Sequence, residues 1–181
     1  TRDQNLMTTE PDGSWFYQQL DLGFNYRMTD IHAALGLSQL DRLDDFINRR
    51  HLIAKTYFEE LKIDGVVLPY QHKNCISSFH LFILNFIDSS GPRSQNEVFN
   101  RLKDSGVNVN LHYIPIYRHP YYSAMGFERS HFPKAEIYYQ RAVSIPMYPN
   151  LSEDEQSFVI DVIKSDQSRK FEKPKGLQNR F

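Results

Sequence analysis

The chain has 181 residues, 40% of them hydrophobic and 24% charged, which is enough to build one globular domain with an extension. Its 21 Lys and Arg against 22 Asp and Glu give a net charge of -1, and no long basic run attracts nucleic acid locally. No apolar run approaches the roughly 20 residues of a membrane helix. A nucleic-acid partner and a membrane span are therefore not expected. The single cysteine, Cys75, cannot form an internal disulfide, which favours a reducing, cytoplasmic location.

Residues 1–29 are predicted to form a long loop. They contain the turn signal Pro11-Asp12-Gly13 and show neither helical nor alternating periodicity. The chain starts without an initiator methionine or a signal-peptide pattern, so we expect it to be the back part of a longer protein.

A long helix is predicted from Asp30 towards Lys62, because apolar residues recur at helical spacing along this stretch. Thr29 is a suitable N-cap, and Asp30 suits the positive end of the helix dipole. The pattern leaves open whether a kink near Asp44-Asp45 divides the helix.

The remaining chain interleaves strands and short helices, which predicts an α/β or α+β domain. Alternating or branched apolar residues predict strands over 77–87 and 107–113. Helical periodicity predicts helices over 94–104, 133–142 and 153–164. The 11 Tyr and 13 Phe are expected in the core, because base-stacking surfaces come with basic grooves that are missing here. Residues 166–181 are basic and lack periodicity, and we expect a tail.

Asn25 and Arg27, just before the long helix, form the first candidate site. A helix N-terminus stabilises anions, Asn25 can donate from its amide, and Arg27 offers a planar fork that matches phosphate or carboxylate oxygens. The alternative is an ordinary turn Asn beside a surface Arg.

His112 and Tyr113 form the second candidate site. Both side chains donate and accept hydrogen bonds, which suits a sugar or nucleotide. A solvent-facing strand edge is the alternative, and the residue pattern by itself favours it. The seven histidines show no metal-ligand spacing, so no metal site is expected.

Four segments in this order and spacing resemble the second half of the DegT/DnrJ/EryC1/StrS family. They are GFNYRMTDIHAALGLSQL (23–40), SSFHLFIL (77–84), GVNVNLHYIP (106–115) and SIPMYPNLSEDEQ (144–156). The resemblance implies a sugar aminotransferase that uses pyridoxal phosphate and has the fold type I architecture. Within the family, the LHYIPIYRHPYY run is most similar to enzymes that aminate a sugar in pseudaminic acid synthesis.

The resemblance also implies an organisation and a set of roles. Residues 1–29 would belong to the large domain and active-site region, and residues 30–165 to a C-terminal small domain with a dimer-contacting helix. Asn25 would reach the cofactor phosphate across a homodimer with shared active sites. Arg27 would lie near the diphosphate of the nucleotide sugar, and His112 and Tyr113 would face the substrate.

The family's Schiff-base Lys has no counterpart in this chain and is expected upstream of Thr1, so the fragment by itself should be inactive. Relatives with His at that position dehydrate sugars instead of aminating them, and this sequence does not decide between the two.

The expected reaction transfers an amino group from glutamate to C4 of a UDP-linked 4-keto-6-deoxy-N-acetyl sugar. The alternatives are an aminotransferase or dehydratase of another nucleotide-linked keto sugar, and a non-catalytic dimerisation or ligand-binding domain.

Overall fold

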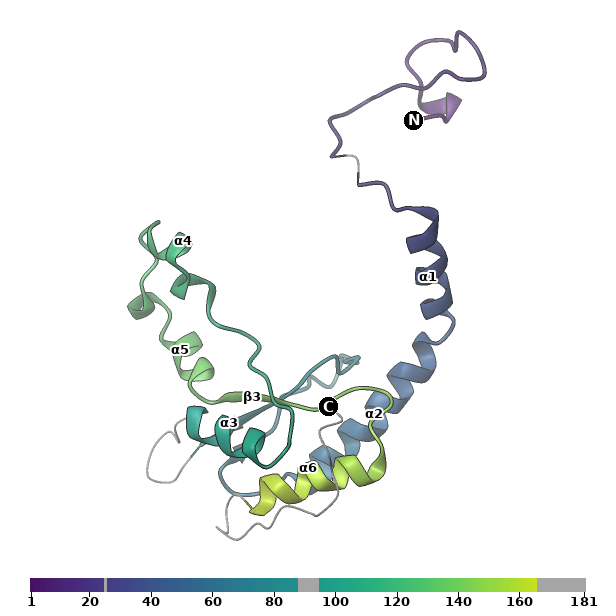
Figure 1. Cartoon of the computed structure of the whole chain (residues 1–181). Helices are drawn as coiled ribbons and strands as arrows, with labels where there is room; N and C mark the ends of the chain where they lie inside the picture. Colours follow the sequence, from purple (N-terminus) through teal and green to yellow (C-terminus); the bar gives the residue numbers. More distant parts are fainter. Residues whose placement is uncertain (25, 88–94, 166–181) are drawn as a thin grey trace. The chain divides into compact units, whose positions relative to one another are not determined.

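The computed structural model describes residues 1–24, 26–87 and 95–165 (Figure 1). The chain divides into two compact units between Asp41 and Arg42. The first helix therefore belongs to the same unit as the N-terminal loop, whereas the sequence suggested a boundary at residue 30. The assignment of the two parts to a large and a small enzyme domain stays a prediction.

The first unit consists of a loop, a short 3-10 helix η1 (Gln4–Leu6) and the helix α1 (Asp30–Leu40). Backbone hydrogen bonds between Thr1 and Gln18 close the loop on itself. Thr29 caps α1 as predicted, because its hydroxyl oxygen accepts a hydrogen bond from the backbone N–H of His32 at 3.3 Å. No residue of α1 is buried.

The structure answers the question that the sequence left open for the predicted long helix, because two helices lie along this stretch. The first ends at Leu40, and α2 runs over Leu43–Glu60. Asp41 closes the last turn of α1, and the acidic residues Asp44 and Asp45 fall in the first turn of α2, where the helix dipole favours negative charge. The break therefore lies at residues 41 and 42, before the Asp44-Asp45 pair.

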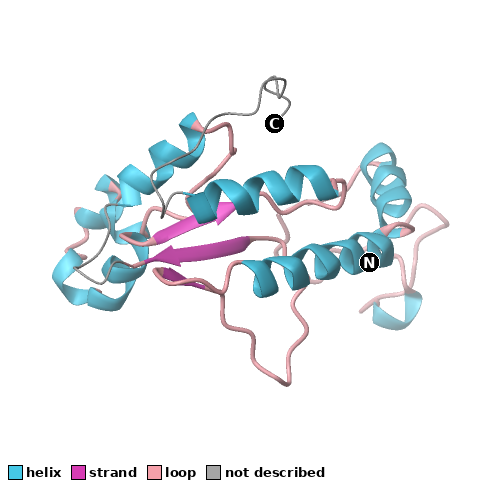
Figure 2. Ribbon diagram, turned by 90° about the horizontal axis from the view of Figure 1, so that it is seen from below, coloured by secondary structure: helices cyan, strands magenta, loops and turns pink. Residues whose placement is uncertain are grey.

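The second unit contains a three-stranded antiparallel sheet, shown in magenta in Figure 2. Its strands are β1 (Val66–Val67), β2 (Phe82–Phe86) and β3 (Ala142–Ile145), in the order β1-β2-β3. Phe82 pairs with Ile145 and Leu84 with Val143. The side chains of β2 alternate in burial, as expected for a strand with one face on the core.

Two strand predictions need correction. The 77–87 strand is confirmed only over β2, because Phe79 adopts a φ of 47° that extended backbone does not allow. The 107–113 segment is not a strand, since a single bridge between Asn110 and Ser144 joins it to β3. Its apolar face is nevertheless buried, at Val107 and Val109. We did not predict β3, whose four residues are all buried and so show no alternation.

Helices α2, α3 (Gln95–Asp104) and α6 (Glu153–Ser165) cover the sheet and close the core. The helices predicted over 94–104 and 153–164 are confirmed as α3 and α6. The helix predicted over 133–142 is confirmed as α5 (Pro133–Tyr139), but its predicted end is wrong, because Ala142 already belongs to β3. The short elements η2 (Ile116–Arg118), α4 (Pro120–Ser123) and η3 (Arg129–His131) precede α5. Gln156 of α6 is buried and donates from Nε2 to the carbonyl oxygen of Ile53 in α2 at 2.8 Å. The largest fully buried side chains are those of Tyr57, Phe82, Ile53, Leu61, Leu84 and Leu102.

The expectation that the aromatic residues form the core is wrong for several rings of the second unit, where Tyr70, Tyr113 and Tyr121 are exposed, and for the first unit. Trp15, Tyr17, Phe24 and Tyr26 are all exposed. A short loop unit cannot enclose large rings, since it has no second layer to pack against them.

Candidate functional site

His112 lies two residues after Asn110, the residue through which the 107–113 segment is bridged to the sheet. The backbone N–H of Ser144 donates to the carbonyl oxygen of Asn110 at 2.8 Å, and that of Asn110 donates to the carbonyl oxygen of Ser144 at 3.1 Å. Two residues further on, Nδ1 of His112 lies 2.8 Å from Oγ of Ser144 and shares a hydrogen bond with it. The histidine is half-buried, and its ring is tied to β3 by this bond.

Tyr113 stands edge-on to His112, with ring centroids 4.6 Å apart and an interplanar angle of 89°. The peptide bond between the two residues is cis. Tyr113 is exposed, and neither its hydroxyl nor Nε2 of His112 has a hydrogen-bond partner among residues 1–24, 26–87 and 95–165. The predicted pair therefore does come together in space and offers two hydrogen-bonding groups to a ligand.

Arg27 is exposed and forms no hydrogen bond or ion pair within the described part of the chain. It follows the stacked rings of Phe24 and Tyr26, whose centroids are 5.5 Å apart. Asn25 lies outside the described residues. Because the chain's own Thr29 caps α1 and Asp30 occupies its first turn, the anion hypothesis rests on the side chains of Asn25 and Arg27 rather than on the helix end. An amide donor and a guanidinium fork are a donor set that suits phosphate oxygens.

Arg27 belongs to the first unit, and His112 and Tyr113 belong to the second. The structure describes each site within its own unit. It supports the pairing of His112 with Tyr113, whereas the link between the two candidate sites stays a prediction.

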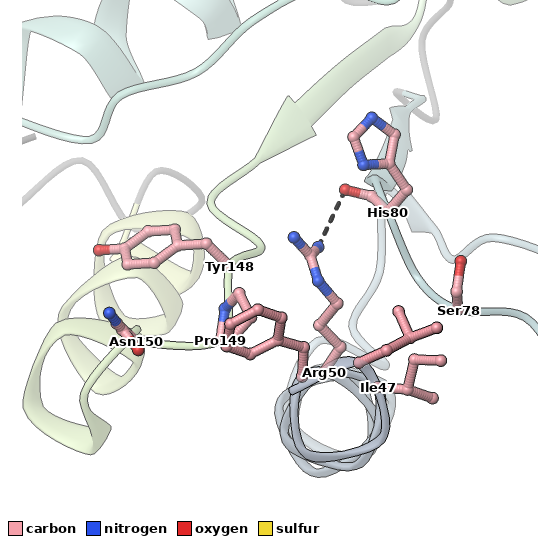
Figure 3. Close-up of a pocket in the computed structure, with 9 residues that line it drawn as sticks. Ile47, Arg50, Ser78, His80, Tyr148, Pro149 and Asn150 are labelled. Atoms are coloured by element: carbon pink, nitrogen blue, oxygen red, sulfur yellow. Dashed lines mark hydrogen bonds between the residues drawn. The ribbon is translucent and has the colours of Figure 1, made fainter. Parts of the chain in front are cut away.

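A pocket of about 420 Å³ opens beside the N-terminal half of α2, and the sequence did not reveal it (Figure 3). Three segments of the second unit line it: Leu43, Phe46, Ile47 and Arg50 of α2, Ser78 and His80 before β2, and Tyr148, Pro149 and Asn150 after β3. Figure 3 shows Arg50 rising from the helix towards His80.

Arg50 holds these segments together. Its Nη1 donates to the carbonyl oxygens of Phe79 at 2.9 Å, His80 at 3.1 Å and Met147 at 2.8 Å. Burial lowers the pKa of Arg50, since desolvation disfavours the charged form. The signal that the sequence offered is the position of Arg50 on the apolar stripe of this helix, three residues after Ile47 and four before Ala54, where a solvated charge is unusual.

The segment after Tyr113 forms a small aromatic lobe over residues 116–139. The guanidinium of Arg118 donates hydrogen bonds to both carboxylate oxygens of Glu136, with Nε 2.8 Å from Oε1. The same guanidinium lies 4.3 Å from the ring centroid of Tyr139. The rings of Tyr117 and Phe132 stack at 4.4 Å. The hydrogen bonds from Arg118 hold the pKa of the Glu136 carboxyl below its ordinary value.

The described segments offer neither a metal site nor a membrane span. No group of three or more His, Cys, Asp or Glu side chains among them is placed to hold a metal ion. None of their helices combines the length and the apolar character needed to cross a bilayer.

Comparison with known proteins identifies the family of the chain. Residues 5–164 match the pattern of the DegT/DnrJ/EryC1/StrS aminotransferase family. The chain belongs to this family. It is 36% identical over 156 residues to the spore coat polysaccharide biosynthesis protein SpsC of Bacillus subtilis, a match that covers 84% of this chain and 40% of SpsC. It is 31% identical over 153 residues to the UDP-4-amino-4,6-dideoxy-N-acetyl-beta-L-altrosamine transaminase of Campylobacter jejuni, covering 83% of this chain and 40% of that protein.

Solved structures agree with this assignment. The apo form of the putative sugar aminotransferase Spr1654 from Streptococcus pneumoniae superposes with a TM-score of 0.77 at 28% identity, covering 88% of this chain and 40% of that one. The same protein has been solved in PLP and PMP forms. The predicted α/β fold of this DegT/DnrJ/EryC1/StrS family member is thereby confirmed, and its family uses pyridoxal phosphate. The chain spans about 40% of the length of the relatives it matches.

Proposed function

We propose that this member of the DegT/DnrJ/EryC1/StrS family is part of a pyridoxal-phosphate-dependent aminotransferase that acts on a nucleotide sugar. The family match carries the proposal, because it extends over residues 5–164 and so includes Arg27, His112 and Tyr113. The sugar we propose is a UDP-linked 4-keto-6-deoxy-N-acetyl sugar of the pseudaminic acid pathway. The Campylobacter relative, named as a transaminase of an amino-deoxy-altrosamine, supports this choice.

The reaction exchanges two groups. Glutamate gives up its amino group and becomes 2-oxoglutarate, and C4 of the sugar exchanges its keto oxygen for that amino group. Pyridoxal phosphate, when bound, serves as the electron sink and carries the amino group between the two substrates.

The residues of this chain would bind and orient. The side-chain amide of Asn25 would donate a hydrogen bond to the cofactor phosphate of the neighbouring subunit in a homodimer. Cofactor retention would therefore depend on dimer formation. Arg27 would place its exposed guanidinium against the diphosphate of the nucleotide sugar. Binding energy from this remote charge would orient the reacting carbon of the sugar.

His112 and Tyr113 would hold the sugar end of the substrate. The exposed hydroxyl of Tyr113 and Nε2 of His112 can each form one hydrogen bond to a sugar hydroxyl or an acetamido oxygen. The edge-on contact between the two rings supports a joint role for these side chains.

The test is a product analysis on the enzyme that contains this chain together with its expected preceding part. It is supplied with glutamate and a panel of UDP-, GDP- and dTDP-linked 4-keto sugars, and mass spectrometry follows the sugar while an enzymatic assay follows 2-oxoglutarate. We expect a 4-amino sugar and an equal amount of 2-oxoglutarate, with the UDP-linked N-acetyl sugar turned over best.

Other outcomes identify the alternatives. Loss of water from the sugar without 2-oxoglutarate would identify a dehydratase. Faster turnover of another nucleotide sugar would reassign the substrate. Binding without turnover would leave a non-catalytic ligand-binding domain and contradict the proposal.

A further inference from the structure

Ser144 is a polar residue in a strand that is otherwise apolar and fully buried. It is 4% exposed, and the strand β3 reads Ala142-Val143-Ser144-Ile145. Val143 and Ile145 belong to the hydrophobic core, so the alternation of a strand turns Ser144 to the opposite face. A buried hydroxyl needs a hydrogen-bond partner, since an unpaired one costs free energy.

The partner is His112. Oγ of Ser144 lies 2.8 Å from Nδ1, and within the described part of the chain this is the one hydrogen bond of either side chain. Either the serine hydroxyl donates to Nδ1 or Nδ1–H donates to Oγ, and the tautomer decides which. In both cases Nδ1 is occupied, and Nε2 is the nitrogen that remains available to a ligand.

The backbone prepares this contact independently of the serine side chain. The two hydrogen bonds between Asn110 and Ser144 hold the histidine's own segment against β3. The edge of the Tyr113 ring then limits the His112 ring from a second side. The hydroxyl of Ser144 supplies what these contacts lack, namely a directional bond that sets which ring nitrogen faces outward.

We propose that Ser144 is a positioning residue, which acts through His112 by fixing the orientation of its ring for the sugar nucleotide. The proposal rests on the role of His112 in the proposed function. It assigns no contact with substrate to Ser144 itself.

A double-mutant cycle in the cofactor-loaded enzyme tests the proposal. Ser144→Ala should raise KM for the sugar nucleotide about fivefold to tenfold, the effect of one hydrogen bond, with kcat and cofactor retention unchanged. His112→Ala should raise KM at least as much, and the double variant should match His112→Ala because Ser144 has nothing left to orient. Ser144→Thr keeps the hydroxyl and should restore most of the affinity.

Ser157→Ala serves as the matched control, because it removes an exposed serine hydroxyl from the same unit. Additive effects of Ser144→Ala and His112→Ala would overturn the proposal, as would an unchanged KM in Ser144→Ala when His112→Ala is impaired. A crystal structure of the Ser144→Ala enzyme separates the two hypotheses. A ring that keeps its orientation contradicts the positioning role, whereas a turned ring combined with normal kinetics in His112→Ala supports positioning and contradicts the substrate role of His112.

Discussion

The guanidinium of Arg50 donates a hydrogen bond from Nη1 to the carbonyl oxygen of Met147 across 2.8 Å, and so joins two residues 97 positions apart in the chain. The same nitrogen also contacts the carbonyl oxygens of Phe79 and His80. One side chain of α2 therefore fixes the segment that enters β2 and the segment that leaves β3. Both segments line the pocket of Figure 3.

Arg50→Ala should destabilise the second unit by about 3 kcal/mol, because it removes a charged donor from three carbonyl groups. Arg50→Lys should recover only part of this loss, since an ammonium group cannot reproduce the planar fork. Urea unfolding followed by circular dichroism measures the change. Lys62→Ala removes an exposed cation just after the same helix and should leave the midpoint unchanged. Equal midpoints for Arg50→Ala and Lys62→Ala would show that the three hydrogen bonds do not stabilise the fold.

The Arg118–Glu136 pair should make the aromatic lobe sensitive to acid. Hydrogen bonds from Arg118 lower the folded-state pKa of Glu136, so the pair stabilises the lobe above the ordinary glutamate pKa. That contribution is lost as the pH falls through the lowered folded-state pKa. NMR signals of the Tyr117 and Phe132 rings should therefore broaden or shift at the acid end of a titration. In Glu136→Gln the same signals should be perturbed already at neutral pH and change less on acidification, and an identical titration of both proteins would argue against the pair.

Substitutions of Asn25 and Arg27 should impair different properties of the enzyme that contains this chain, namely cofactor retention and affinity for the nucleotide sugar. Asn25→Ala should weaken retention of pyridoxal phosphate and make it depend on dimer concentration, because the amide is proposed to hold the phosphate across the dimer. Arg27→Ala should keep the cofactor and raise KM for the nucleotide sugar by the equivalent of about 1.5–3 kcal/mol, the range for a hydrogen bond to a charged group. Arg27→Lys should recover part of that affinity.

Cofactor absorbance and sugar-nucleotide kinetics are measured in parallel for all three variants. Cofactor loss in Arg27→Ala together with a pure substrate defect in Asn25→Ala would reverse the two roles. Wild-type behaviour of every variant would leave the segment as an ordinary helix start.

The apolar side chains of α1 should drive self-association of the 181-residue chain. Ile31, Leu35, Leu37 and Leu40 are all exposed, and exposed apolar surface of this kind is typical of an interface. Sedimentation velocity should show dimers or larger species, and the double variant Ile31→Glu/Leu35→Glu should shift them towards monomer. His32→Glu, which adds a charge without removing an apolar side chain, is the control. A chain that stays monomeric at every concentration would speak against α1 as a dimer contact.

Local patterns predicted much of the fold. The start of α1 at Thr29 could be recognised from its capping chemistry, and α3 and α6 from one apolar stripe each, since these signals lie within a few residues. The 107–113 segment shows the limit of this reasoning. Its alternation correctly indicates a buried face at Val107 and Val109, but alternation does not report whether a neighbouring strand supplies more than one pair of hydrogen bonds.

The sequence was sufficient to indicate the family, the mixed fold class and the candidate pair His112 and Tyr113, because motif order and side-chain chemistry are properties of the chain. Tertiary structure decided which groups meet. Ser144 reaches His112 across 32 positions, and Arg50 reaches Met147 across 97, and no local pattern encodes either contact. Each contact depends on how β3 pairs with β2 and how α2 packs beside the sheet. Burial of the whole core sets that arrangement, so no single segment of the sequence determines it.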